Sequence, residues 1–124
     1  MTQIKDAQGE GTGEKESLAV RQTISESTST LIREALYQSV QEGTGAVAAV
    51  DGYTIAGKTG IAEKLPRGVG NYLVSFCGFV PADNPQMLVY IVIDTPHTED
   101  QAHSSYASSM CGRIMADILP DSGL

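Results

Sequence analysis

Apolar residues recur at helical spacing between residues 26 and 42. They are three or four positions apart, which places them on one stripe of a helix, and we expect that stripe to be core. Ser25 precedes the segment as a candidate N-cap, and Gly43 follows it as a C′ glycine. The members of the stripe are Leu31, Ile32, Ala35, Leu36 and Val40.

Three segments with strand character follow this helix, at residues 56–63, 71–81 and 87–93. The second alternates between two faces, with Val74 and Phe76 on one and Ser75 and Cys77 on the other. The third is apolar throughout, so we expect it to be covered on both faces, at the centre of a sheet with helices against each side. Short connections predict an antiparallel meander.

A second helix is predicted near the C-terminus, ending at Pro120. Its apolar stripe extends over nearly four turns and, at roughly 25 cal/mol per Å² of buried apolar area, is sufficient to hold a helix against a sheet. The stripe consists of Tyr106, Ala107, Met110, Cys111, Ile114, Met115, Ile118 and Leu119.

The first 23 residues are polar and predict a hairpin with flexible character, pairing residues 2–5 with residues 18–23. Residues 24–119 then supply a helix, a three-strand meander and the C-terminal helix. The expected fold class is α+β, of the α/β sandwich type. It has an antiparallel sheet of about three to five strands, with an N-terminal-side helix and a long C-terminal helix packed on it.

Composition limits the function classes. A chain of 124 residues with 41% apolar content can bury one core, so it is one domain or part of one. Its net charge of -7 argues against nucleic acid or an anionic membrane as a partner. No run of eighteen apolar residues and no charged leader occurs, so we expect a soluble chain whose parent, if anchored, has its membrane anchor upstream.

Cys77 and Cys111 lie in apolar segments without a Cys or His at metal-ligand spacing. This favours buried free thiols over a zinc site, and the sequence leaves a disulfide between them open. His103 has no nucleophile nearby in the sequence, which favours a surface or capping role. We expect no metal and no cofactor.

The candidate chemistry lies in Lys58, Thr59 and Gly60, in the first strand of the meander. Successive side chains alternate along a strand, so Lys58 and Gly60 share one face and Thr59 and Ile61 share the other. Gly60 permits close approach of a second backbone, and a free N–H beyond it can donate to a carbonyl or an oxyanion.

The same letters satisfy a nucleotide-binding pattern, G-x-x-x-x-G-K-[ST], over residues 52–59. That motif needs a helix starting at the Lys-Thr pair, whose N-terminal N–H groups hold the phosphate. Gly60, Pro66, Gly68 and Gly70 leave no room for such a helix. The nucleotide interpretation is therefore disfavoured, and an exposed strand lysine without a role is the plain alternative.

Lys58-Thr59-Gly60, with Glu42-Gly43-Thr44-Gly45 before it and Tyr72–Pro81 after it, resembles the C-terminal part of the transpeptidase domain of class B penicillin-binding proteins. The resemblance extends over about residues 20–119. It implies a serine D,D-transpeptidase that cross-links peptidoglycan at the extracytoplasmic face of the bacterial membrane. Its expected partners are the peptidoglycan stem peptide and β-lactams.

The resemblance also implies residue roles. Lys58 supplies positive charge to the cleft, Thr59 binds the carboxylate of a stem peptide or β-lactam, and Gly60 makes room for the substrate backbone. The Ile61 N–H is an oxyanion donor and the one catalytic group expected in this chain. Most relatives have Thr where Ile61 stands, so a hydroxyl contact to ligand is missing while the backbone donor remains.

The family's Ser-x-x-Lys and Ser-x-Asn motifs are missing from this chain. The residues three before Lys5, Lys15, Lys58 and Lys64 are Thr2, Thr12, Ile55 and Ile61. We therefore expect the isolated chain not to catalyse transpeptidation. The second hypothesis is a non-catalytic binding or interaction module with the same sheet. In either case an exposed sheet edge favours self-association, in a swapped or edge-paired homodimer.

Overall fold

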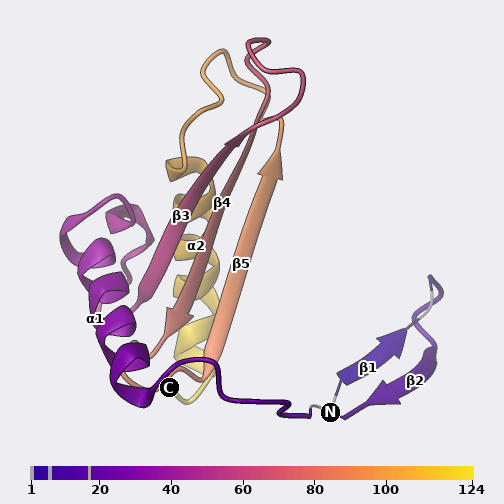
Figure 1. Ribbon diagram of the computed structural model, residues 1–124, viewed down its shortest axis with the longest axis vertical. Coiled ribbons are helices and arrows are strands. Elements are labelled where there is room, and N and C mark those ends of the chain that lie inside the picture. The colour runs from indigo at the N-terminus through magenta and orange to yellow at the C-terminus, as the bar shows by residue number, and fades with distance from the viewer. Residues whose placement is uncertain (1, 6, 17) are drawn as a thin grey trace.

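The computed structural model describes residues 2–5, 7–16 and 18–124, and its centre is an antiparallel sheet. The sheet has the order β3 (Ala56–Glu63), β4 (Tyr72–Val80) and β5 (Met87–Asp94), so β4 is the central strand. Helices α1 (Glu26–Glu42) and α2 (Ser105–Ile118) flank the meander in sequence, with short 3-10 turns η1 (Ala46–Ala48) and η2 (Leu119–Asp121). The expected α+β class is confirmed (Figure 1).

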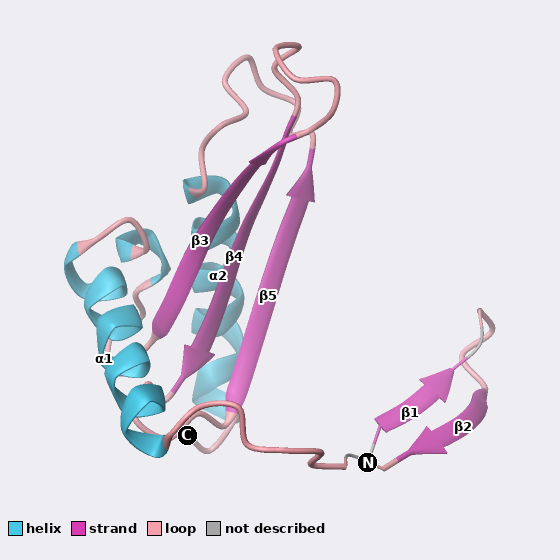
Figure 2. Cartoon of the chain, viewed as in Figure 1, coloured by secondary structure: helices cyan, strands magenta, loops and turns pink. Residues whose placement is uncertain are grey.

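The helices gather on one face of the sheet. α2 lies behind the three strands and α1 lies beside β3 (Figure 2). The alternation expected for β4 is confirmed, because Val74, Phe76 and Val80 are fully buried on the helix-facing side. The core joins both helices to this side and comprises Val40, Ala48, Ile55, Phe76, Val80, Ala107, Cys111, Met115 and Leu119.

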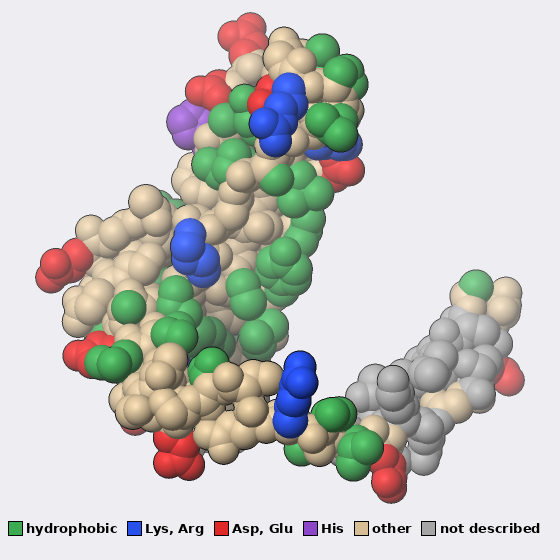
Figure 3. Space-filling view, in the orientation of Figure 1, with side chains coloured by type: hydrophobic (Ala, Val, Ile, Leu, Met, Phe, Trp, Pro, Cys, Tyr) green, Lys and Arg blue, Asp and Glu red, His purple; other side chains and the backbone are tan. Residues whose placement is uncertain are grey.

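The opposite side of the sheet, which we call the open face, is exposed along β5 and half-buried along β4, while Ala56 of β3 is fully buried. Strand pairing places Ala56, Phe79 and Leu88 in one row and Lys58, Cys77 and Tyr90 in the next, and the third row holds Gly60, Ser75 and Val92. Leu88, Tyr90 and Val92 are 63%, 60% and 47% exposed. Hydrophobic side chains gather along the β5 side of the molecule in Figure 3.

The prediction that residues 87–93 form a central strand covered on both faces is therefore wrong. β5 lies at the edge of the three-stranded sheet, and its residues alternate between half-buried and exposed. An uninterrupted apolar run is typical of a strand with two covered faces. Among the described residues, α2 covers only one face of β5, which produces the alternation.

α1 matches its predicted boundaries but buries less than predicted. Ser25 Oγ accepts a hydrogen bond from the Thr28 N–H at 3.1 Å, which confirms the N-cap. Val40 is fully buried, whereas Leu31 and Ile32 are 67% and 47% exposed, so the prediction that the whole stripe is core is wrong. Only the C-terminal part of the helix reaches the core beside β3.

Gly43 ends α1 by a different geometry from the one predicted. Its backbone is extended, with φ -112° and ψ -155°, and not left-handed, and its N–H donates to the Ser39 carbonyl at 3.1 Å. A Cβ at this position would lie 2.8 Å from the Ser39 oxygen. Glycine is therefore needed for close approach to the preceding turn, not for positive φ.

α2 confirms the predicted C-terminal helix, with a narrower buried stripe. Ala107, Cys111, Met115 and Leu119 are fully buried, while Met110 and Ile118 are 46% and 39% exposed. Pro120 lies inside η2 and so follows the α-helix directly, as a proline that cannot continue it.

The N-terminal hairpin has a different partner strand from the one predicted. β1 (Thr2–Lys5) pairs with β2 (Gly11–Lys15), and residues 18–23 are not in a strand. The short connection between Lys5 and Gly11 closes this hairpin, and its length lies within the range that hairpin loops commonly have. Met1, Asp6 and Ser17, within the segment expected to be flexible, lie outside the described residues.

Replacing Gly57 with Ala tests the packing under β3. A Cβ at Gly57 would lie 2.3 Å from Phe76 Cζ and 2.8 Å from the Cys77 carbonyl oxygen, so the buried ring must move. We expect Gly57→Ala to lower the free energy of unfolding by about 1–3 kcal/mol, as overpacked cores do. Gly11→Ala is the matched control, because no atom lies within 4 Å of its Cβ position. Equal urea midpoints for the two variants would contradict the packing described.

Candidate functional site

The Lys-Thr-Gly segment lies in β3, at an edge of the three-stranded sheet. The pairing places Lys58 opposite Cys77, Thr59 opposite Phe76 and Gly60 opposite Ser75. Paired residues in a ladder point to the same side of a sheet. Lys58 and Gly60 therefore belong to the open face and Thr59 to the helix-facing side, as the sequence predicted.

The outer edge of β3 presents backbone groups at regular intervals. The Lys64 N–H donates to the Asn71 carbonyl at 2.8 Å, one pair beyond the ladder that joins β3 to β4. Residues in antiparallel strands alternate between pairs that exchange hydrogen bonds and pairs that do not. Because the Lys64–Asn71 pair is hydrogen-bonded, every second residue before Lys64 also bonds to β4, which includes Ala62 and Gly60. The N–H and C=O groups of the residues in between, Ile61 and Thr59, therefore point to the free edge.

The Lys58 ammonium lies at this same edge. Its Nζ donates to the Thr59 carbonyl at 2.7 Å, and the side chain is exposed. A positive charge and the outward Ile61 N–H thus lie along one strand edge. Such an edge suits an anionic ligand in an extended conformation, since a peptide can add to a sheet edge through backbone hydrogen bonds.

Thr59 extends the site toward the end of α1. Its Oγ1 lies 3.4 Å from the Thr44 Oγ1, in the loop that leaves the helix. This contact makes Thr44 a candidate site residue, which inspection of the strand alone missed. The sequence signal for Thr44 was the Gly-Thr-Gly triplet at residues 43–45. The triplet lies well before β3 in the sequence, so the sequence did not show that the two are in contact.

Gly60 has a structural role that the sequence did not reveal. A Cβ at this position would lie 2.5 Å from the Ser75 Oγ on the neighbouring strand. The glycine therefore accommodates Ser75 on the open face, and any side chain at residue 60 would displace that hydroxyl. Space for a ligand backbone remains a prediction about Gly60.

The backbone excludes the nucleotide interpretation. β3 continues through Glu63, so Lys58 and Thr59 lie inside a strand and no helix starts at them. A phosphate cradle needs the N–H groups of such a helix.

Acid–base and metal chemistry have few candidates in the described part of the chain. No group of three or more His, Cys, Asp or Glu side chains there is placed to hold a metal ion. His103 lies at the surface, with Nε2 2.7 Å from Asp100 Oδ2, and this contact and the Ala102 N–H hold the pKa of Asp100 below its usual value. The contact is remote in sequence from β3, in the linker before α2.

The two cysteines are free thiols in different environments. Cys111 is buried in the core, and burial, followed by the charge of Cys77, raises the pKa of the Cys111 thiol to about 11. Cys77 is half-buried in the row of the open face that contains Lys58. The possible disulfide is absent, and only Cys111 fits the prediction of a buried thiol.

Comparison with known proteins places these features in a family. Residues 1–119 match the profile of the penicillin binding protein transpeptidase domain. The chain is 46% identical to stage V sporulation protein D of Bacillus subtilis over 110 residues, covering 86% of this chain and 17% of that protein. It is 37% identical over 116 residues to a probable peptidoglycan D,D-transpeptidase PenA of Neisseria flavescens, covering 88% of this chain and 28% of that protein.

Solved structures give the same result for the fold. Penicillin binding protein 3 of Mycobacterium tuberculosis, complexed with ampicillin, matches with a TM-score of 0.72 and 28% identity, over 97% of this chain and 29% of that one. The D,D-transpeptidase domain of an Eggerthella lenta peptidoglycan glycosyltransferase matches with a TM-score of 0.67 and 29% identity, over 98% and 27% of the two chains. The chain thus spans less than a third of each of these relatives.

Thiol labelling tests the two sides of the sheet, because Cys77 lies on the open face and Cys111 lies in α2 on the helix-facing side. At pH 8 the buried Cys111, with its pKa of about 11, carries very little thiolate. We expect iodoacetamide to modify Cys77 in the native chain and Cys111 only after denaturation. Mass spectrometry of tryptic peptides identifies the labelled residue, with Cys77→Ser as the control that removes native labelling. Equal labelling rates at both cysteines would contradict the assigned faces.

Proposed function

Because the chain belongs to the penicillin-binding protein transpeptidase family, we propose that it is the C-terminal portion of a D,D-transpeptidase that cross-links peptidoglycan. The observation that carries this proposal is the edge of β3, where the Lys58 ammonium and the outward Ile61 N–H lie together. In this function the edge forms one side of the substrate cleft. The ligands are a peptidoglycan stem peptide and β-lactams.

Each residue of the edge has a distinct role in this proposal. Lys58 gives the cleft a positive charge in a chain of net charge -7, and so attracts an anionic substrate. The Thr59 hydroxyl, beside that of Thr44, donates to the substrate carboxylate. Gly60 has no side chain to project over the strand next to Ser75, so that a substrate backbone can lie along it.

Ile61 supplies the catalytic group. In acyl transfer by a serine enzyme, attack on the carbonyl creates an oxyanion that backbone N–H groups stabilise. The outward Ile61 N–H is placed to be one of these donors, and its side chain takes no part. The nucleophile and its base belong to a Ser-x-x-Lys motif, which a Ser-x-Asn motif faces, and this sequence contains neither motif.

The open face and the free edge of β5 are the surfaces on which we place the remainder of the transpeptidase domain. Leu88, Tyr90 and Val92 are apolar and exposed there, on the side of the sheet that carries Lys58. The relatives are several times longer than this chain, which supports such an arrangement. The proposed location is the extracytoplasmic face of the membrane. None of the helices described has the length and apolarity needed to span a bilayer.

A non-catalytic binding module with the same β3 edge is the second candidate. It is favoured by the lack of a Ser-x-x-Lys motif in this sequence. The two proposals predict different outcomes when a segment with the missing motifs is supplied. Only the transpeptidase portion then forms a covalent adduct with penicillin.

A fluorescent penicillin separates the two. We expect no covalent labelling of the isolated chain, and labelling of the serine on an upstream transpeptidase segment when the two are co-expressed. Lys58→Ala should slow this acylation by about 10²-fold, the cost of removing one electrostatic stabiliser. Arg113→Ala is the control, because that exposed cation lies on α2, outside the β3 edge.

Two results would contradict the proposal. Covalent labelling of the isolated chain would show that a nucleophile exists within it. An assembled pair that folds yet takes up no penicillin would favour the binding module.

Self-association is a further expected outcome for the isolated chain. β5 is an edge strand, and its exposed apolar residues carry no charge before Asp94 to discourage pairing. We expect light scattering at high concentration to give a mass above the 13.1 kDa of one chain. Tyr90→Lys should restore the monomer, whereas Ile118→Lys, on α2, should not. A wild-type monomer would contradict this expectation.

A further inference from the structure

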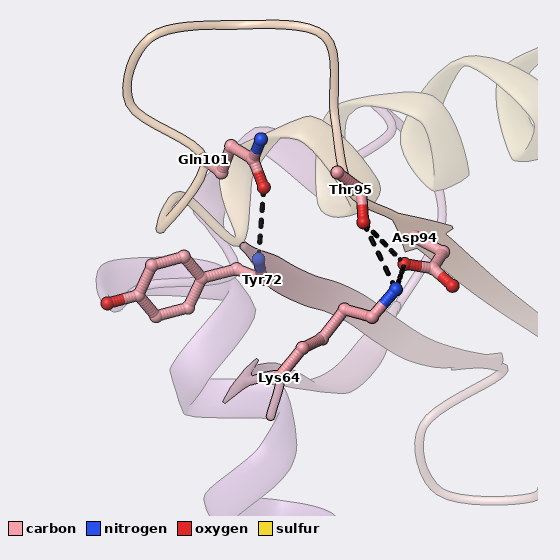
Figure 4. Close-up of polar contacts among 5 residues, drawn as sticks. All are labelled: Lys64, Tyr72, Asp94, Thr95 and Gln101. Atoms are coloured by element: carbon pink, nitrogen blue, oxygen red, sulfur yellow. Dashed lines mark hydrogen bonds and ion pairs between the residues drawn. The ribbon is translucent and has the colours of Figure 1, made fainter. Parts of the chain in front are cut away.

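A polar cluster joins the ends of β3 and β5 across the start of β4. Lys64 Nζ lies 2.5 Å from Asp94 Oδ1 and 3.2 Å from Thr95 Oγ1 (Figure 4). The Thr95 hydroxyl in turn donates to Asp94 Oδ1 at 2.8 Å. These three groups, which we call the Lys64 cluster, connect the two outer strands of the sheet by side chains alone.

The backbone of Tyr72, the first residue of β4, makes two further hydrogen bonds next to the Lys64 cluster. The Thr95 N–H donates to the Tyr72 carbonyl at 2.8 Å. The Tyr72 N–H donates to Gln101 Oε1 at 3.0 Å (Figure 4). These two bonds tie the loop of residues 95–104 to the start of β4, while the bond from the Lys64 N–H to the Asn71 carbonyl closes the base of the loop of residues 64–71. Glu63 Oε1 also accepts from the Gly68 N–H at 2.6 Å, which closes the first loop on itself.

Thr95 is held in an unfavourable backbone conformation at this point. Its φ is +50°, and a β-branched residue in the left-handed region is rare. Such conformations persist where the surroundings over-determine them, and they cluster at functional sites. The contacts of the Thr95 N–H and hydroxyl are the restraints that hold it here.

The Lys64 cluster is adjacent to the catalytic end of β3. Lys64 is the first residue after the strand and lies three positions beyond Ile61. β3 bonds to β4 along one side only in the described part of the chain, so its last residues have few other restraints. A side-chain link to β5 reduces the freedom of this end to rotate or slide against β4.

We propose that Lys64, through Asp94 and Thr95, is a positioning residue that fixes the C-terminal half of β3 and hence the direction of the Ile61 N–H. The inference rests on the proposed function, because it is the oxyanion donor that gives this direction its importance. Lys64 acts through the strand and does not touch the substrate. The lowered pKa of Asp94, caused first by its hydrogen bond from Lys64, agrees with an ionised carboxylate in this contact.

The plain alternative is an ordinary surface ion pair. The side chains of Lys64 and Asp94 are 40% and 59% exposed, and exposed pairs stabilise proteins little. The two interpretations differ in where an effect appears. A positioning link slows the local opening of the β3 end, by as much as an exposed charge pair can contribute, and leaves the start of the strand unaffected. An ion pair that stabilises nothing changes the opening at neither place.

Amide hydrogen exchange of the chain measures this opening directly. The N–H groups of Gly60 and Ala62 flank Ile61 and bond to β4, while that of Ala56 reports on the start of the strand. We expect Lys64→Met to speed exchange at Gly60 and Ala62 by about two- to fivefold, in the range of an exposed charge pair. Exchange at Ala56 should not change. Arg67→Met is the matched control, an exposed cation of the same loop.

Charge reversal distinguishes the contact from a general effect of losing lysine. Lys64→Asp and Asp94→Lys should each speed exchange at Ala62, and the double variant should restore the original rate. Unchanged exchange in Lys64→Met, or equal acceleration at Ala56 and Ala62, would overturn the proposal. These readouts need no acylation, so a failure of the proposed function appears separately in the penicillin assay.

Discussion

The packing of the Phe76 ring is the constraint on which the rest of the structure depends. Phe76 is fully buried at the centre of β4, and glycines from three segments lie against its ring. A Cβ at Gly45, Gly57 or Gly78 would lie 3.3, 2.3 or 2.8 Å from a ring carbon. One aromatic side chain thus sets the distances between the α1 loop, β3 and β4, because protein interiors are too closely packed for any of them to shift alone.

This packing explains how the candidate site is positioned. Gly57 lies on the ring directly before Lys58, so β3 is held from the helix-facing side while its outer edge stays free. Gly45, which also contacts the ring, brings the adjacent Thr44 to Thr59. The hydroxyl pair and the start of the strand that carries Lys58 are therefore arranged by one hydrophobic contact beneath them.

The two faces of the sheet carry different kinds of side chain. The helix-facing side contains the main core cluster, whereas the open face carries Lys58 together with exposed apolar residues of β5. Apolar surface of this kind is typical of an interface. The proposed function gives this asymmetry a meaning, since a cleft between two parts of a domain needs one face left uncovered by the part that carries Lys58. The Lys64 cluster lies at the end of β3, where Lys64 contacts Asp94 at the end of β5.

Local chemistry in the sequence determined the elements of this protein from residue 25 onward, but not the second strand of the N-terminal hairpin. Helical spacing and the Ser25 cap were sufficient to place α1 and α2 within a residue or two, because capping and periodicity depend on neighbours in the chain. Alternation along β3 placed Lys58 and Thr59 on opposite faces for the same reason. The Lys-Thr-Gly motif and its surroundings indicated the family without any coordinates.

Only the tertiary structure decided which surfaces are covered. Every second residue of the apolar β5 run was predicted as core and is exposed, and so are Leu31 and Ile32. Burial depends on what packs against a segment and not on its own composition. The contacts of Gly60 with Ser75, Thr59 with Thr44 and Lys64 with Asp94 join residues 15 to 30 positions apart. The periodicity of a sequence does not show which distant residues come into contact. Strand register and the packing around Phe76 determine these contacts.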